Sequence, residues 1–158
     1  MKTVSLQEIK QELKTLPAKE IAELCLRLAR FKKDNKELLA FLLFDAYNLE
    51  AFIEDVKTDM DEAFGNLNTS NIYLAKKTLR KVLRMANKYI RYIASKQAEV
   101  QLLSHFCIKL KESGIILNKN KALHNMYLQQ IKKIHAALHA LHPDIQYDFI
   151  KVINNLEK

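Results

Sequence analysis

The sequence predicts an all-α fold, and three observations support this prediction. Only 2 of the 158 residues are Gly and 2 are Pro, which leaves few turn formers for a fold built of β-hairpins. Apolar residues recur at helical spacing along most of the chain. Hydrophobic residues make up 49% of the chain and charged residues 28%, a balance typical of a chain that buries a core. We therefore expect one all-helical domain over residues 1–158, with about eight helices.

The first two helices are marked by their N-terminal residues. Ser5 followed by Glu8 forms a capping box, which predicts a helix that begins at about residue 6. Pro17 is well placed as the first residue of a second helix, because its fixed φ suits the first turn and its missing N–H costs nothing there. An apolar stripe then continues at helical spacing as far as Phe31.

The next two helices differ in how apolar they are. Asp34 with Glu37 is a box-like cap, which predicts a helix that continues through residues 38–44. Because this segment is apolar almost all round, we expect it to be the most buried helix. Asn48 predicts the cap of a fourth helix, and Gly65 its end at the C′ position.

The second half of the chain is expected to form four more helices. The pattern from residue 72 to about 111 would make a single helix of roughly 60 Å, which is too long for a compact domain, so we expect a break near Ser95. Asn118 and Pro143 predict the starts of the last two helices. The helices would then form four hairpin pairs, at roughly 5–31, 35–64, 71–112 and 119–156. We expect these pairs to stack as an α–α superhelix of the HEAT or TPR kind, with an irregular helical bundle as the alternative.

The opening stretch also resembles known sequences. Residues 13–24 read Leu-Lys-Thr-Leu-Pro-Ala-Lys-Glu-Ile-Ala-Glu-Leu, and residues 33–39 follow after a Lys-rich turn. This part is similar to uncharacterised bacterial all-helical families of unknown function, which share the pattern "L-K-x-L-x-x-x-E-L-x-E-L" and a later "K-E-L". The resemblance covers residues 1–45. It implies a bacterial helical protein and no particular activity, so no residue role is carried over.

The sequence also carries signals about compartment. The N-terminus has no apolar segment typical of a secretory signal, and the longest apolar run, residues 38–44, is far short of the roughly 20 residues that span a bilayer. Cys25 and Cys107 stand alone within helical patterns, which indicates buried free thiols rather than a disulfide. We therefore expect a cytoplasmic protein with no membrane span.

Charge is the unevenly distributed feature of this chain. The net charge is +8, but residues 45–65 hold seven acidic residues and one basic, whereas residues 66–98 hold eight basic residues and no acidic one. On a helical wheel the basic residues from 76 to 91 fall within an arc of about 140°. We call one set of residues on this side of the helix 72–94 the basic face: Tyr73, Lys77, Arg80, Lys81, Arg84, Lys88 and Arg91.

The basic face has three possible explanations. Its like charges repel each other at i,i+4 spacing, so it favours an external partner or a nearby acidic surface. The acidic helix 48–64 could neutralise it, or it could be simply solvated. The third explanation is an anion-binding surface, with nucleic acid as the first candidate and an acidic protein or membrane headgroups after it.

The histidines of the penultimate helix form a weaker candidate site. His135 and His139 lie four residues apart, so both imidazoles could reach one metal ion from the same face. No His-Glu-x-x-His motif is present, and the neighbouring apolar residues favour packing at the edge of the core. We therefore expect no cofactor.

No catalytic constellation emerges from the sequence. Ser104 and His105 are adjacent, and adjacent side chains in a helix diverge by about 100°, which does not suit a triad. We expect a non-enzymatic binding or scaffold module that contacts an unknown protein partner through its helical surfaces. The alternative is a nucleic-acid-associated protein that uses the basic face, and the third hypothesis is a His-rich metal-binding helical protein.

Overall fold

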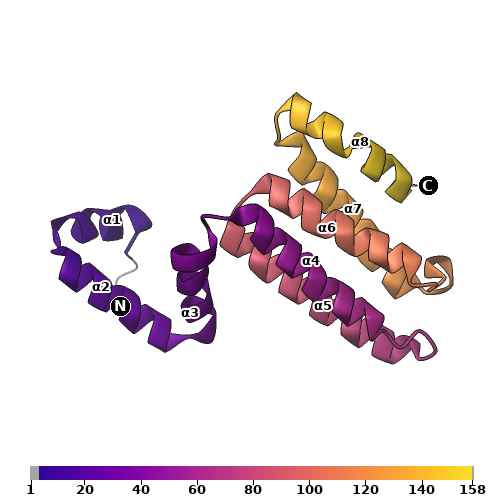
Figure 1. Cartoon of the computed structure of the whole chain (residues 1–158), viewed down its shortest axis with the longest axis horizontal. Coiled ribbons are helices and arrows are strands. Elements are labelled where there is room, and N and C mark those ends of the chain that lie inside the picture. Colours follow the sequence, from indigo (N-terminus) through magenta and orange to yellow (C-terminus); the bar gives the residue numbers. More distant parts are fainter. Residues whose placement is uncertain (1–3, 158) are drawn as a thin grey trace. The chain divides into compact units, whose positions relative to one another are not determined.

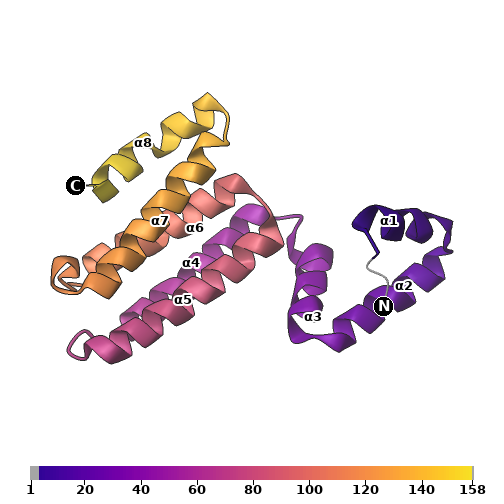
Figure 2. The same ribbon diagram turned by 180° about the vertical axis from the view of Figure 1, so that it is seen from behind.

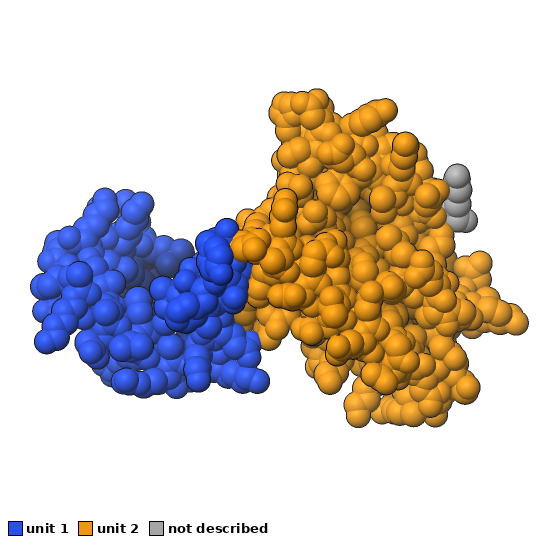
Figure 3. Space-filling view, in the orientation of Figure 1, with its two compact units in different colours: residues 1–47 blue, residues 48–158 orange. Residues whose placement is uncertain are grey.

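The structure is a computed structural model that describes residues 4–157. It contains eight α-helices, and no β-strand occurs within residues 4–157, which confirms the all-α prediction. No helix in this range combines the length and the apolar character needed to cross a bilayer. The chain divides into two compact units, residues 1–47 and residues 48–158 (Figure 3). That residues 1–158 form one all-helical domain stays a prediction.

Unit 1 begins with two helices close to their predicted positions. The first, α1, spans Leu6–Thr15. The Glu8 N–H donates to Ser5 Oγ at 3.3 Å and the Ser5 N–H donates to Glu8 Oε2 at 2.7 Å, which confirms the capping box. The second, α2, spans Ala18–Phe31. Pro17, the predicted first residue, is its N-cap with an extended backbone, so the helix begins one residue later than predicted.

The rest of unit 1 departs from the sequence prediction. The helix α3 spans Lys33–Ala40, and the π-helix η1 spans Phe41–Asp45. Asp34 lies in the first turn of α3 and does not cap it, since Lys32 holds the N-cap position. The expectation that residues 38–44 form the most buried helix is wrong, because Leu42, Leu43 and Phe44 are 57%, 62% and 67% exposed. An apolar helix is enclosed only when neighbours surround it, and α1, α2 and α3 bury none of their own residues.

Unit 2 holds the main core and is organised around one central helix. Its elements are α4 (Leu49–Gly65), α5 (Ile72–Ile93), α6 (Lys96–Glu112), the 3₁₀ turn η2 (Leu117–Lys119), α7 (Lys121–His139) and α8 (Pro143–Glu157). The helix α6 packs against α4, α5, α7 and α8 (Figure 1). Its residues Leu102, Leu103 and Phe106 are fully buried. The predicted hairpin pairs 71–112 and 119–156 are present, since α5 packs on α6 and α7 packs on α8, and a regular superhelical stack stays a prediction.

Helix boundaries in unit 2 follow side-chain caps. The pattern from 72 to 111 is divided where expected, because Ala94 adopts a left-handed conformation with φ of 52° and Ser95 caps α6 by accepting from the Ala98 N–H. The N-cap of α7 is Asn120, two residues after the predicted Asn118, since residues 117–119 form a 3₁₀ turn before the helix. Asparagine side chains cap three more helices of unit 2: Asn48 for α4, Asn71 for α5 and Asn120 for α7.

The C-terminal end of α8 is held by side chains of α6 and α7. The Tyr127 hydroxyl donates to the Leu156 carbonyl at 2.6 Å, and Lys111 Nζ donates to the Asn155 carbonyl at 3.0 Å. Burial raises the pKa of Tyr127 to about 12. These bonds satisfy carbonyl groups that the last turn of a helix otherwise leaves without a partner.

Candidate anion-binding groove

The helix α5 buries one side and presents the basic face on the other. Its buried stripe consists of Ala75, Leu79, Val82, Leu83 and Ala86. Tyr73 is 72% exposed. The cations of the basic face are exposed as well, with Lys88 as the exception: Lys77, Arg80, Lys81, Arg84 and Arg91. The helical spacing of apolar and basic residues therefore predicted which side of α5 faces outward.

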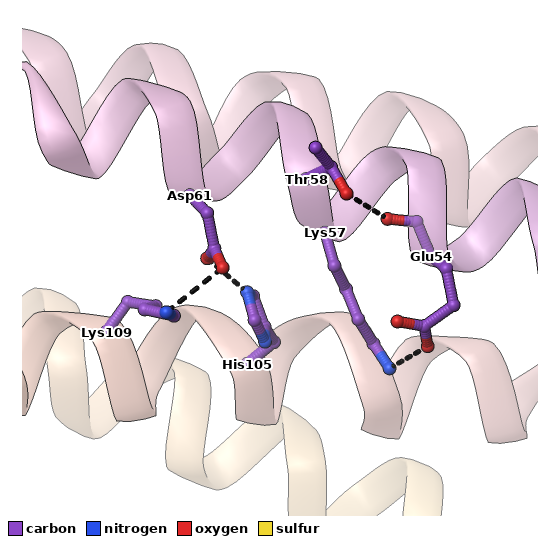
Figure 4. A network of polar contacts seen from close by, with 6 residues as sticks. All are labelled: Glu54, Lys57, Thr58, Asp61, His105 and Lys109. Atoms are coloured by element: carbon purple, nitrogen blue, oxygen red, sulfur yellow. Dashed lines mark hydrogen bonds and ion pairs between the residues drawn. The ribbon is translucent and has the colours of Figure 1, made fainter.

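Within residues 4–157, no ion pair joins the acidic helix α4 to the exposed cations of the basic face. The helix α4 packs against α5, and two of its carboxylates form ion pairs with residues outside α5. Asp61 Oδ1 lies 2.6 Å from His105 Nε2 and its Oδ2 lies 3.0 Å from Lys109 Nζ, both on α6 (Figure 4). Glu54 pairs with Lys57 on its own helix at 2.6 Å.

Five cations of the basic face have no ion-pair partner in the part of the chain that the structure describes. They are Lys77, Arg80, Lys81, Arg84 and Arg91. Each therefore keeps its full set of donors for solvent or for a bound group.

Lys88 is the member of the basic face with a different environment. It is half-buried, and its Nζ lies 4.7 Å from the ring centroid of Tyr89 and 5.9 Å from that of Tyr92. These distances fit cation–π contacts within the same helix. Lys88 is thus held by aromatic rings, and the binding surface of α5 is carried by the exposed cations.

The basic face forms one wall of a groove between α5 and α7. Figure 2 shows these two helices beside each other on one side of unit 2. The groove has a volume of about 650 Å³. Its α5 wall consists of Tyr73, Lys77, Arg80, Leu83, Arg84 and Asn87, and its α7 wall consists of Ala122, Asn125, Met126, Gln129 and Gln130. We call it the α5–α7 groove.

The α7 wall was not predicted from the sequence. Its polar residues are amides and not charged groups, so no charge pattern marked them. The sequence nevertheless contains a signal for this wall. Residues 113–143 contain no Asp or Glu, and residues 66–98 contain none either. Neither α5 nor α7 holds a carboxylate, so every ionised side chain of the two helices that form this groove is cationic.

Two amide side chains of the groove are positioned by their own helices. The Asn87 Nδ2 group donates to the Leu83 carbonyl at 2.6 Å, and its Oδ1 lies 3.5 Å from Lys133 Nζ on α7. The Gln130 Nε2 group donates to the Met126 carbonyl at 3.0 Å. Gln130 Oε1 is covered and accepts no hydrogen bond from the described residues, so it is an unsatisfied acceptor beneath the groove.

The groove is suited to binding an anion. A guanidinium binds phosphate or carboxylate through two parallel hydrogen bonds, whereas a Lys ammonium acts as a compact point charge. Arg80 and Arg84 lie one helical turn apart, so their guanidinium groups can reach neighbouring anionic groups. The groove lining includes no carboxylate, His, Cys or Ser.

The histidine pair occupies a different place, near the end of α8. The ring centroids of His135 and His139 lie 6.4 Å apart, and His135 Nε2 lies 2.6 Å from Glu157 Oε1. Within residues 4–157 no group of three His, Cys, Asp or Glu side chains could hold a metal ion. The structure therefore adds no third ligand to the metal candidate.

The two cysteines are free thiols. Cys107 is buried in α6, and burial raises the pKa of its thiol to about 12, an effect that the charge of Lys111 opposes. Cys25 is half-buried. A buried thiol with so high a pKa is not a nucleophile at neutral pH.

Comparisons with family models, with curated proteins and with solved structures found no match to this chain.

Proposed function

We propose that this chain is a non-enzymatic binding module whose α5–α7 groove binds the phosphate backbone of a nucleic acid. The observation that carries the proposal is the set of exposed cations on α5 without ion-pair partners, three of which line a groove between two helices that lack carboxylates. Placement in the cytoplasm and in a bacterial helical family belongs to the same proposal.

The chemistry of binding would be neutralisation of phosphate charge. Arg80 and Arg84 would each form paired hydrogen bonds to a phosphate, and Lys77 would add a point charge. Such binding depends little on nucleotide sequence and weakens steeply with salt, because it releases condensed counterions.

Binding of a protein partner is the second candidate, and unit 1 favours it. The residues of α1–α3 are not buried, and the apolar side chains of this unit include several that are more than half exposed: Leu6, Leu28, Phe31, Leu42, Leu43, Phe44 and Tyr47. Exposed apolar side chains in such number are typical of interaction surfaces. A scaffold role would combine this surface with the groove of unit 2.

A fluorescence-anisotropy titration of the full chain with a labelled oligonucleotide at about 50 mM salt tests the first proposal. We expect the double variant Arg80→Gln/Arg84→Gln to bind at least about tenfold more weakly, because each charge-assisted hydrogen bond contributes about 1.5–3 kcal/mol. Both arginines are exposed, so the variant should keep its fold.

The matched control is Lys119→Gln/Lys151→Gln, which removes the same charge from exposed positions of unit 2 outside the groove. It should bind within about twofold of the unmodified chain. Equal loss in both variants would show binding to net charge alone and would contradict a role for the groove. No binding by the unmodified chain would contradict the proposal altogether.

A further inference from the structure

We infer that the α5–α7 groove takes one single strand of nucleic acid, with its phosphates on the α5 wall and its bases against the α7 wall. This inference rests on the proposed function and specifies its ligand. It follows from the different chemistry of the two walls, from the size of the groove and from the position of Tyr73.

The two walls offer different hydrogen-bonding groups. The α5 wall presents Lys77, Arg80 and Arg84, which are donors only and carry positive charge. The α7 wall presents Asn125 and Gln129, both exposed, whose amides contain donors and acceptors and no charge. Phosphates match the first set, and the edges of bases match the second. A ligand that satisfies both walls needs phosphates and bases on opposite sides, as an unpaired strand has.

The size of the groove favours a strand over a duplex. Its volume of about 650 Å³ lies within the range of roughly 300–1,000 Å³ that is usual for small-ligand sites. A duplex carries its phosphates outside and its base edges inside its own grooves, where a protein reaches them with an inserted helix or ribbon. A groove between two helices would meet only the backbone of a duplex, so the amide wall would be left without partners.

Tyr73 supplies a stacking surface beside the phosphate-binding residues. It lines the groove in the first turn of α5 and is 72% exposed. Lys77 and Arg80 follow it on the same side of α5. Aromatic rings beside a cationic track are the common arrangement in proteins that bind single strands, because every base has a face that can stack.

Salt dependence separates the two modes of binding. A single strand on the three cations of the groove should give a slope of log affinity against log salt of about −2. A duplex lying across the five exposed cations of the basic face should give a slope of about −4.5. Between 50 and 200 mM salt these slopes correspond to losses of about 20-fold and about 500-fold in affinity.

The test uses fluorescence anisotropy with the full chain and three probes of equal length, about 12 nucleotides. The probes are a mixed-sequence DNA strand, the same strand as a duplex, and a strand of abasic sites with the same number of phosphates. We expect the mixed strand to bind about tenfold more tightly than the duplex and the abasic strand, with a shallower salt slope than the duplex.

Two variants assign the base contacts to the groove. Tyr73→Leu and Asn125→Ala/Gln129→Ala should each weaken binding of the mixed strand about three- to tenfold and leave binding of the abasic strand unchanged. The matched control is Gln97→Ala/Asn154→Ala, which removes two exposed amides outside the groove and should change neither affinity.

The outcomes separate this inference from the proposed function. Equal binding of all three probes, or tighter binding of the duplex, would overturn the single-strand inference while the phosphate-binding proposal stood. The variants Tyr73→Leu and Asn125→Ala/Gln129→Ala could also keep the full preference for the mixed strand. This result would place the bases outside the groove and would overturn the single-strand inference too. Failure of all three probes to bind would overturn both.

Discussion

At the scale of single residues, Asp61 is the carboxylate that joins α4 to the core helix α6. It contacts His105 Nε2 at 2.6 Å and Lys109 Nζ at 3.0 Å (Figure 4). Partial burial acts to raise the pKa of Asp61, but hydrogen bonds from Lys109 and His105 and the positive charge beside it outweigh burial and lower that pKa below 3.8. The contact keeps an acidic side chain of α4 directed at α6 and away from the basic face.

Substitution of Asp61 should make the free energy of unfolding depend less on pH in the acid range. Because folding lowers the pKa of Asp61, its ionised form stabilises the fold above about pH 3.8, and this contribution is lost as the pH falls through the folded-state value. Asp61→Asn should therefore unfold more easily than the unmodified chain at pH 5, by less than about 1 kcal/mol, since the side chain is 41% exposed. Urea unfolding at a series of decreasing pH values measures the free energy of unfolding of both proteins. The difference between them should shrink below about pH 3.8.

Asp59→Asn is the matched control for this measurement. Asp59 lies on the same helix, is exposed, and has no hydrogen bond or ion pair within the described residues. Its substitution should change stability by less than about 0.5 kcal/mol at either pH. A constant deficit of Asp61→Asn across the whole pH range would contradict the assigned pKa shift.

At the scale of elements, the junction of α5 and α6 decides how the basic helix is presented. Ala94 separates them in the left-handed region with φ of 52° and ψ of 33°, and Ser95 then caps α6. A side chain in this region is strained by its Cβ, which glycine lacks. Ala94 therefore adopts a strained backbone conformation at a position where helices commonly end in Gly.

Ala94→Gly should stabilise the chain by about 1 kcal/mol, because relief of the left-handed conformation exceeds the added entropy of the unfolded chain. The same exchange at Ala136, an exposed interior position of α7, should destabilise by about 1 kcal/mol. Chemical denaturation of both variants gives the two signs. A loss of stability at both positions would contradict the left-handed geometry at Ala94.

The sequence predicted elements better where a polar side chain marks their start. Ser5, Asn48 and Ser95 cap helices as expected, since each cap is a local hydrogen bond that depends on nearby residues alone. Residues 38–44 were mispredicted because burial depends on which helices surround a segment, and periodicity carries no information on that. Their π-helical turn has no sequence signal that we can identify.

The residues of the candidate site likewise divide into some that the sequence predicted and others that it could not predict. Spacing along one helix predicted that Tyr73, Arg80 and Arg84 share an exposed face, because a helix fixes the direction of its side chains. The α7 wall could not be predicted, since it depends on how α5 and α7 are placed across α6. The pairing of Asp61 with Lys109 is likewise a contact between segments far apart in sequence, and it directs one carboxylate of α4 toward α6.

At the scale of the whole molecule, the two units differ in how much they bury. The continuous hydrophobic core lies entirely within residues 48–158 and includes Met60, Leu79, Phe106 and Ile134. Unit 1 is about 47 residues long, and its three α-helices bury no residue. In chains of this length a single hydrophobic core rarely supplies more than about 3–5 kcal/mol, and oligomerisation is one common source of further stability.

The isolated segments should therefore behave differently. Residues 48–158 expressed alone should be helical, unfold in one cooperative transition and keep the oligonucleotide affinity of the full chain, since both walls of the groove lie within them. Residues 1–47 alone should show little helix, because burial stabilises helices more than their own propensity does. Circular dichroism during thermal unfolding checks both expectations, and a stable helical segment 1–47 would contradict the second.

The concentration of acidic residues on α4 and of basic residues on α5 affects how unit 2 approaches a charged partner. The helix α4 holds six carboxylates and one Lys, and α5 holds seven cations and no carboxylate. Because opposite net charges are concentrated on these two helices, they contribute an electric dipole moment that can orient unit 2 in the field of a charged partner. A polyanion would attract the α5 side and repel the α4 side before contact. Collisions would then be oriented, so dilution of salt should raise the association rate more than it lowers the dissociation rate.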